Sequence, residues 1–284
     1  MLWIAFDENR RRSYSFYMRL DHYLSAVGIG TRSEVKKIIS KGRVTVDGAV
    51  CKDAGFQVNA DGSEVCCDGK KLRYREFVYF LLNKPQGIIS ASKADLRNPS
   101  ERCVVDLIAE EQHRKLFPVG RLDKDTEGLL LITDDGKLAH NLLSPAKHVD
   151  KIYYAELGLP LSEEDRKRIE AGIDIGDETP TLPAVIERVL FTDAAGAADG
   201  TGTFCEGGSR ATDLNRVYIT IREGRFHQIK RMFEAVGNEV TFLKRISMGS
   251  LRLDPGLAPG EYRELTTEEL QSLTGEEPEK NCSP

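Results

Sequence analysis

The chain has 284 residues, 40% of them hydrophobic and 30% charged, which is the composition of an ordinary globular protein. No apolar run approaches the roughly 20 residues that a membrane-spanning helix needs, so we expect no membrane association. The formal net charge is −5. Residues 260–284 account for all of it, with seven acids against two bases. Residues 1–259 are therefore neutral overall, and local basic patches are not excluded.

The six cysteines show neither Cys-x-x-Cys spacing nor a histidine at zinc-ligand spacing, so the sequence predicts no metal site. Reduced thiols are typical of a cytoplasmic protein, and we expect a cytoplasmic location. Residues 1–17 place Arg10, Arg11 and Arg12 after their first apolar residues, the reverse of signal-peptide order. We expect these 17 residues to be a disordered leader or the product of a start codon assigned too far upstream.

Residues 18–75 predict a small module of two helices and a hairpin. Leu20, Leu24 and Val27 recur at helical spacing, and Thr31 precedes Glu34 by three residues, as in the capping box of a second helix. An alternating segment around an Asp-Gly turn then predicts a hairpin. Five bases stand against one acid between residues 31 and 45, namely Arg32, Lys36, Lys37, Lys41 and Arg43. A solvated helix face is one explanation, but the compact, one-signed excess favours phosphate contact.

Residues 120–133 read Gly-Arg-Leu-Asp-Lys-Asp-Thr-Glu-Gly-Leu-Leu-Leu-Ile-Thr, a charged turn that runs into an apolar strand. The unbroken apolar run predicts a strand buried on both faces, and Asp123 lies in the turn directly before this strand. Such an aspartate often only hydrogen-bonds its own backbone. Asp123, Asp125 and Glu127 also imitate the first ligands of a calcium loop. We reject calcium because a strand follows instead of a helix and two neighbouring bases compete.

Three other segments carry recognisable strings. Asn-Lys-Pro-Gln-Gly at residues 83–87 ends an apolar strand in a turn. Lys-Ile-Tyr at residues 151–153 lies in a predicted strand, where a tyrosine is usually a packing residue. Residues 224–232 read Gly-Arg-Phe-His-Gln-Ile-Lys-Arg-Met within a basic stretch. Between two further predicted strands, residues 193–213 are rich in Gly, Ala, Ser and Thr, and we expect them to be disordered.

In this order, the strings resemble those of the ribosomal RNA pseudouridine synthases with an N-terminal S4 domain, and most closely the small-subunit (16S) enzymes. The resemblance covers residues 18–272. It implies an α+β fold, with an S4 RNA-binding domain at 18–75 and a catalytic domain with a mixed, largely antiparallel sheet at 76–272, followed by an acidic tail at 273–284. It also implies ribosomal RNA as the partner, either naked or in a partly assembled subunit, and no cofactor or metal; a monomer is the default.

The implied reaction isomerises one uridine of ribosomal RNA to pseudouridine. The resemblance makes Asp123 the catalytic residue, stacks Tyr153 on the target base, and gives Lys230 the role of active-site cation in one-point contact with Asp123. Because neighbouring strand residues point to opposite faces, only one of Tyr153 and Tyr154 can line the pocket. The remaining expected RNA contacts of this domain are Arg121, Lys151, Arg225, His227, Gln228 and Arg231. We interpret His227 as structural or RNA-facing rather than as a general base.

Three alternatives remain open from the residues alone. A synthase of the same family could act on 23S rRNA. A non-catalytic S4-type assembly factor would share the basic helix but would have no use for Asp123, Tyr153 and Lys230 together. A magnesium-dependent nuclease could use the carboxylates of the 120–133 motif, and it would lose activity with a chelator.

Overall fold

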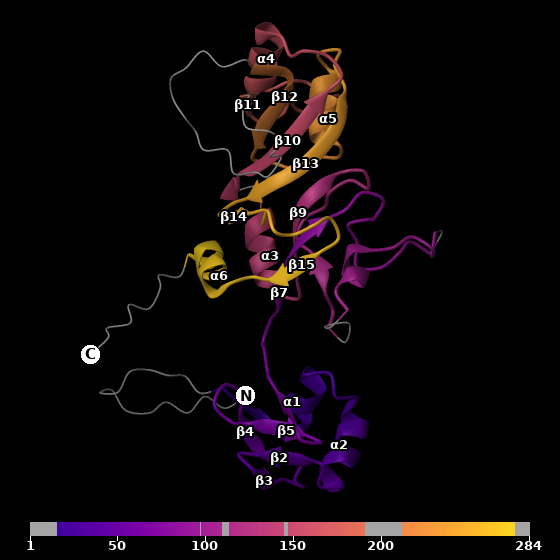
Figure 1. Cartoon of the computed structure of the whole chain (residues 1–284), viewed down its shortest axis with the longest axis vertical. Coiled ribbons are helices and arrows are strands. Elements are labelled where there is room, and N and C mark those ends of the chain that lie inside the picture. Colours follow the sequence, from indigo (N-terminus) through magenta and orange to yellow (C-terminus); the bar gives the residue numbers. More distant parts are fainter. Residues whose placement is uncertain (1–15, 97, 110–113, 145–146, 191–211, 276–284) are drawn as a thin grey trace, which may run out of the picture. The chain divides into compact units, whose positions relative to one another are not determined.

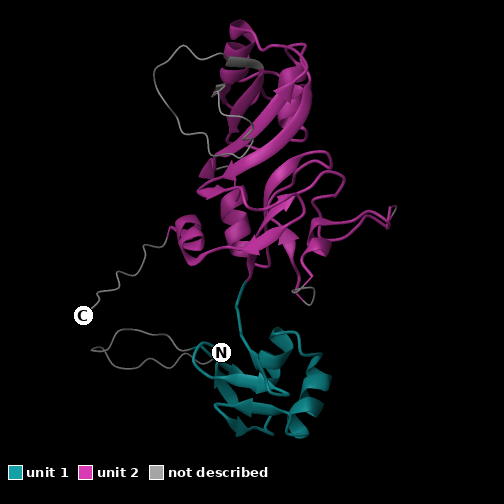
Figure 2. Ribbon diagram, viewed as in Figure 1, with its two compact units in different colours: residues 1–77 teal, residues 78–284 magenta. Residues whose placement is uncertain are grey.

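The computed structural model describes residues 16–96, 98–109, 114–144, 147–190 and 212–275 (Figure 1). The chain divides into two compact units, residues 1–77 and 78–284 (Figure 2). Residues 1–15 of the expected leader and 276–284 of the expected tail lie outside the described part. Residues 193–211 of the expected disordered loop also lie outside the described part. Its last two residues, Thr212 and Asp213, instead begin a strand.

The described residues of the first unit form two short helices and six short strands. In chain order its elements are β1 (Tyr17–Arg19), α1 (Leu20–Ala26), α2 (Arg32–Ser40), β2 (Val44–Val46), β3 (Ala49–Val50), β4 (Gln57–Asn59), β5 (Val65–Cys67) and β6 (Lys70–Leu72). β1 pairs with β4, and the other strands form a sheet in the order β3-β2-β5-β6. The expected capping box is present: the Thr31 hydroxyl accepts from the Glu34 amide, and the Glu34 carboxylate accepts from the Thr31 amide. The two helices and the hairpin of this module are as predicted.

The N-terminal boundary of this unit differs from the sequence prediction. Tyr17, assigned to the leader, opens β1, and the Phe16 carbonyl accepts from the Ala60 amide. Tyr74, next to the last residue of the expected module, packs its ring against Phe16 and Tyr23. Phe16 and Tyr74 are partly buried against the core of this unit, and they extend it.

The second unit is built on a nine-stranded sheet with helices on both faces. Its elements are β7 (Tyr79–Lys84), the 3₁₀ helix η1 (Val104–Leu107), β8 (Phe117–Pro118), β9 (Glu127–Thr133), α3 (Gly136–Leu143), β10 (Lys151–Leu157), α4 (Glu163–Glu170), β11 (Val185–Leu190), β12 (Thr212–Ile221), α5 (Gln228–Glu234), β13 (Val240–Met248), β14 (Leu251–Arg252), β15 (Tyr262–Glu264) and α6 (Thr267–Thr274).

The strand order is β11-β12-β10-β13-β9-β7-β15, with β14 added to β13 and β8 to β9 (Figure 1). All neighbours are antiparallel except β13 and β9, which run parallel. The expected α+β fold with a mixed, largely antiparallel sheet is therefore confirmed.

Each face of the sheet has its own core. Leu130 and Ile132 of β9 pack in one cluster with residues of α4 and α5, whereas Leu129 and Leu131 pack in another with residues of α3 and α6. Gly128 to Thr133 are all buried. The unbroken apolar run of this strand thus reflects burial on both faces, as predicted. At the C-terminal end, α6 reaches Thr274, so the assignment of Leu273 and Thr274 to the tail was wrong.

The parallel pair joins the two halves of the sheet through only two residue pairs, Lys244 with Glu127 and Arg245 with Gly128. Gly128 has φ of +101°, and a Cβ there would lie 2.2 Å from the Arg245 carbonyl oxygen. Only glycine tolerates both the positive φ and this approach of the two backbones.

We expect Gly128→Ala to lower the unfolding free energy by about 3 kcal/mol or more, because it adds backbone strain to a clash with backbone atoms. Denaturant unfolding measures the loss. Gly136→Ala is the matched control: it opens α3, has no atom within 4 Å of its added Cβ, and should be neutral or slightly stabilising. Equal stabilities of the two variants would contradict the close approach.

Candidate active site

The turn that carries Asp123 is fixed through its backbone. The Nζ of Lys84, a fully buried residue at the end of β7, donates to the carbonyls of Thr126 at 2.9 Å, Lys124 at 3.3 Å and Pro85 at 3.0 Å. The Ser90 hydroxyl donates to the Leu122 carbonyl at 2.8 Å. Sequence reasoning missed Lys84, because its string was interpreted only as a strand that ends in a turn.

Two side chains from the other half of the sheet approach the Asp123 carboxylate. Lys230 Nζ, on α5, lies 3.4 Å from Asp123 Oδ2, and His227 Nε2, at the N-cap of α5, lies 3.6 Å from Asp123 Oδ1. The Asp123 side chain is 28% exposed and lines the pocket, so a bound molecule could reach it.

Lys230 has a second carboxylate partner besides Asp123. Lys230 Nζ donates to both oxygens of Asp125, at 2.6 and 2.8 Å, which are its shortest contacts. The hydrogen bond from Lys230 lowers the pKa of Asp125 below its ordinary value. Lys230 is therefore shared between two carboxylates. Asp125 reaches it because that side chain is 69% exposed and can turn toward the ammonium group.

A pocket of about 840 Å³ opens beside Asp123. Tyr153, from β10, lines its wall and is 7% exposed. Tyr154 points to the opposite face, where it contacts the rings of Tyr218 and Phe242. The wall also contains Lys151, whose Nζ donates to the Val149 carbonyl at 2.9 Å. Burial lowers the pKa of Lys151, and the positive charge of Arg245 lowers it further.

The rim of the pocket includes exposed side chains. Arg121 is exposed on the pocket wall. Phe226 is 71% exposed, and its ring stacks on that of His227 at a centroid distance of 3.8 Å. His227 has φ of +49°, a left-handed conformation that turns its ring toward Asp123. This places His227 in the site itself, beyond the structural or RNA-facing role expected.

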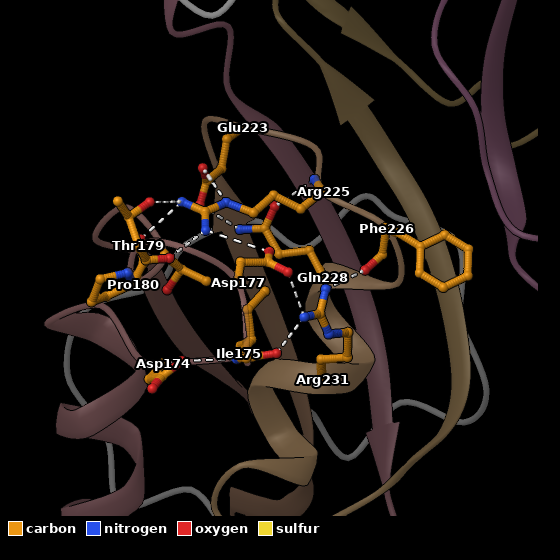
Figure 3. Close-up of polar contacts among 12 residues, drawn as sticks. Asp174, Ile175, Asp177, Thr179, Pro180, Glu223, Arg225, Phe226, Gln228 and Arg231 are labelled. Carbon is orange, nitrogen blue, oxygen red and sulfur yellow. Dashed lines mark hydrogen bonds and ion pairs between the residues drawn. The ribbon is translucent and has the colours of Figure 1, made fainter.

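Three residues expected to contact RNA instead form a clamp within the protein (Figure 3). Arg225 donates to the carbonyls of Thr179 at 2.6 Å and Pro180 at 2.8 Å, and to the Glu223 carboxylate at 3.0 Å. Gln228, 4% exposed, donates to Glu223 and accepts from the Arg225 amide.

Arg231 completes the clamp by binding Asp177 at 2.6 Å and the carbonyls of Ile175 and Phe226 (Figure 3). These donors are used within the protein, and the expectation that Arg225, Gln228 and Arg231 contact RNA stays a prediction. They hold the loop before α5, and through it the positions of His227 and Lys230.

The basic patch of the first unit is open to solvent. Arg32, Lys36, Lys37 and Lys41 are exposed, and none forms an ion pair with another described residue. Arg43 differs, because it forms an ion pair with Asp68. Four of the five expected phosphate-binding side chains are thus available as cations.

The described residues meet the requirements neither of a metal site nor of a membrane span. No group of three or more His, Cys, Asp or Glu side chains in that part of the chain has the arrangement of a metal site. No helix there combines the length and apolar character required to cross a membrane.

Comparison with known proteins gives concordant matches. The family described as RNA pseudouridylate synthase matches residues 78–235, and the S4 domain family matches residues 18–65.

An uncharacterised RNA pseudouridine synthase of Bacillus subtilis (strain 168) is 46% identical over 257 residues, 90% of this chain and 98% of the relative. The ribosomal small subunit pseudouridine synthase A of Escherichia coli (strain K12) is 36% identical over 258 residues, 90% of this chain and 100% of the relative. A crystal structure of a pseudouridylate synthase matches with a TM-score of 0.58 and 33% identity, covering 90% of this chain and 99% of that one.

We expect Arg225→Met to lower the unfolding free energy by about 2 kcal/mol, because two carbonyls and a carboxylate lose their charged donor. The salt dependence of RNA binding should stay unchanged. Lys36→Met is the comparison: it should reduce the slope of log affinity against log salt by about one and leave stability intact. Thermal unfolding and filter binding at several salt concentrations measure both quantities. A reduced slope for Arg225→Met would restore its assignment to RNA.

Lys84 gives a pH-dependent test. Burial lowers the pKa of Lys84 to about 8 from an ordinary value of 10.5, so between these pH values the unfolded chain keeps a proton that the folded chain releases. The Lys84 contribution to the unfolding free energy therefore rises with pH through that window and is constant below it. Denaturant unfolding of the wild type and of Lys84→Met, at several pH values across the window, should show a growing difference in favour of the wild type. A pH-independent difference would contradict the burial of this ammonium group.

Proposed function

The chain belongs to the RNA pseudouridylate synthase family and is an RNA pseudouridine synthase with an S4 domain; from this premise we propose that it isomerises a specific uridine of 16S ribosomal RNA, with Asp123 as the catalytic residue. The observation that carries the proposal is the position of Asp123. Its carboxylate is held by a backbone-anchored turn at the wall of the pocket, with Tyr153 on the same wall and two nitrogen donors within 4 Å.

The reaction requires one bond to break and another to form at the same carbon. The C1′–N1 bond breaks with its electron pair left on the uracil ring. The ring turns in the pocket, C1′ bonds to C5, the C5 proton leaves to solvent, and N1 gains a proton. The Asp123 carboxylate must be ionised, whether it attacks C1′ or removes a ribose proton.

The neighbouring residues divide the remaining work. The ring of Tyr153 offers a flat face on which the detached uracil can stack while it turns. Lys230 places positive charge beside Asp123 and Asp125 and orients both carboxylates. The clamp built on Arg225 and Arg231 positions Lys230, so its contribution is indirect.

The RNA-binding roles follow from exposure and charge. The target nucleotide must leave its stack to enter the pocket, which costs a few kcal/mol that contacts elsewhere must offset. The exposed basic side chains of α2, together with Lys41, supply phosphate contacts of that kind. The 16S assignment rests on the family relationship to the small-subunit enzyme of Escherichia coli. We propose that the protein acts as a cytoplasmic monomer.

The test measures tritium release from C5-tritiated 16S and 23S ribosomal RNA. The wild type should release tritium from 16S RNA, and Asp123→Asn should release none while its RNA affinity, measured by filter binding, stays within about twofold because one uncharged amide replaces a single carboxylate. Asp61→Asn makes the same chemical change in a surface turn of the first unit and should react like the wild type.

Each other outcome is informative. Release from 23S RNA alone would move the substrate to the large subunit. Normal turnover by Asp123→Asn would falsify the assignment of the catalytic residue. Binding without release from either RNA would contradict the proposed substrate.

A further inference from the structure

Arg245 is a buried cation that the roles above leave unused. It lies on β13, is 2% exposed, and donates from Nε to the Leu129 carbonyl at 2.7 Å. Its Nη2 is buried and has no hydrogen-bond acceptor among the described residues. Arg245 also forms no ion pair with any side chain in the described part of the second unit. A buried guanidinium nitrogen without an acceptor is costly, and an acceptor supplied by a ligand would remove that cost.

The strand register directs this side chain to the pocket. Arg245 stands directly opposite Tyr153 in the ladder, so both side chains project from the same face of the sheet. The pairing of β10 and β13 is irregular immediately beyond this pair, where Tyr153 faces Arg245 but Ile152 faces Ser247. Such bulges re-aim side chains beside active sites. Tyr153, Leu243 and Arg245 line the pocket, and all three are buried.

Burial distinguishes the two ends of the pocket. Arg121 and Phe226 are exposed and mark its rim, whereas Tyr153 and Arg245 mark its buried end. An RNA phosphate remains on the backbone strand and meets the rim first. The base of a flipped nucleotide is the part that reaches the buried end.

We propose that Arg245 donates a hydrogen bond from Nη2 to a carbonyl oxygen of the target uracil and holds the ring while it turns. The inference rests on the proposed function and names a substrate contact that completes it. Uracil has carbonyl oxygens at C2 and C4, placed symmetrically about the axis through N3 and C6. Rotation about that axis exchanges N1 with C5 and also exchanges the two oxygens. A fixed donor therefore meets a carbonyl oxygen both before and after the turn.

The same contact contributes to the chemistry and to the choice of base. Cleavage of the C1′–N1 bond leaves negative charge on the uracil, shared by its two oxygens, and a guanidinium stabilises that charge in a buried site. Cytosine carries an amino group in place of one oxygen. In one of its two orientations the cytosine amino group would face the Arg245 guanidinium, and two hydrogen-bond donors would meet. Arg245 therefore selects for uracil.

The experiment compares three variants in the full chain. Arg245→Met removes the donors and the charge, Arg245→Lys keeps the charge without the planar fork, and Lys244→Met removes an equal charge one residue away on the opposite face. Single-turnover tritium release from C5-tritiated ribosomal RNA at saturating enzyme should fall about 100-fold for Arg245→Met and less for Arg245→Lys. Lys244→Met should react like the wild type.

Stability and affinity separate this role from a structural one and from phosphate binding. Because a buried unpaired cation opposes folding, Arg245→Met should unfold at the same temperature as the wild type or a higher one. Its RNA affinity and salt slope should be unchanged. A large fall in unfolding temperature with proportionate loss of activity would make Arg245 structural. A salt slope reduced by about one would assign it to a phosphate. Either result overturns the inference.

A second measurement does not depend on the RNA target. Uridine 5′-monophosphate, observed by NMR line broadening, should bind the wild type and Lys244→Met equally, and Arg245→Met about tenfold more weakly, as loss of one charge-assisted hydrogen bond implies. Equal binding to all three proteins would overturn the inference even if every RNA reaction proceeded. Absence of tritium release from the wild type, with this binding pattern intact, would instead overturn only the proposed RNA substrate.

Discussion

The active site depends on the short parallel contact between β9 and β13. Asp123 precedes β9 in one half of the sheet, whereas Tyr153, Lys230 and Arg245 belong to strands and a helix of the other half. Only two residue pairs join these halves in register, and Gly128 allows the backbones to approach closely enough. The distance between the Asp123 carboxylate and its partners is therefore set by one backbone contact. A catalytic group is useful only within a fraction of an ångström of its working position.

Both halves of the site are held by hydrogen bonds to backbone carbonyls. Lys84 binds two carbonyls of the Asp123 turn, and the arginines of the clamp bind carbonyls of the segment before β11. A charged donor that holds several carbonyls restricts a loop more than apolar packing does, because its hydrogen bonds are directional. Irregular segments with many polar groups can thus stay rigid while their remaining side chains face the pocket.

Sequence patterns predicted the local structure well, and the family strings predicted the fold. The burial of β9 on both faces followed from its apolar run, and the capping box at Thr31 followed from residue spacing. The pairing of charges was not predictable in the same way. Arg225 and its acceptor Thr179 lie 46 residues apart, so the clamp resembled an RNA-binding stretch. Arg245 directly follows Lys244, and two adjacent bases in a sequence do not reveal which of them is buried. Only the strand register shows that one of them is buried.

The charge balance of the chain now has a structural explanation. Its basic residues serve three separate purposes: exposed cations on α2, internally paired arginines in the clamp, and buried cations at the turn and the pocket. Only the first kind contributes to a field that RNA can sense at a distance, so net charge is a poor guide to RNA binding here. The buried kind opposes folding unless it is supplied with acceptors. Lys84 finds carbonyls within the protein, and Arg245 leaves one nitrogen unsatisfied. Lys84 therefore holds the backbone of the site, whereas Arg245 keeps one donor free for the substrate.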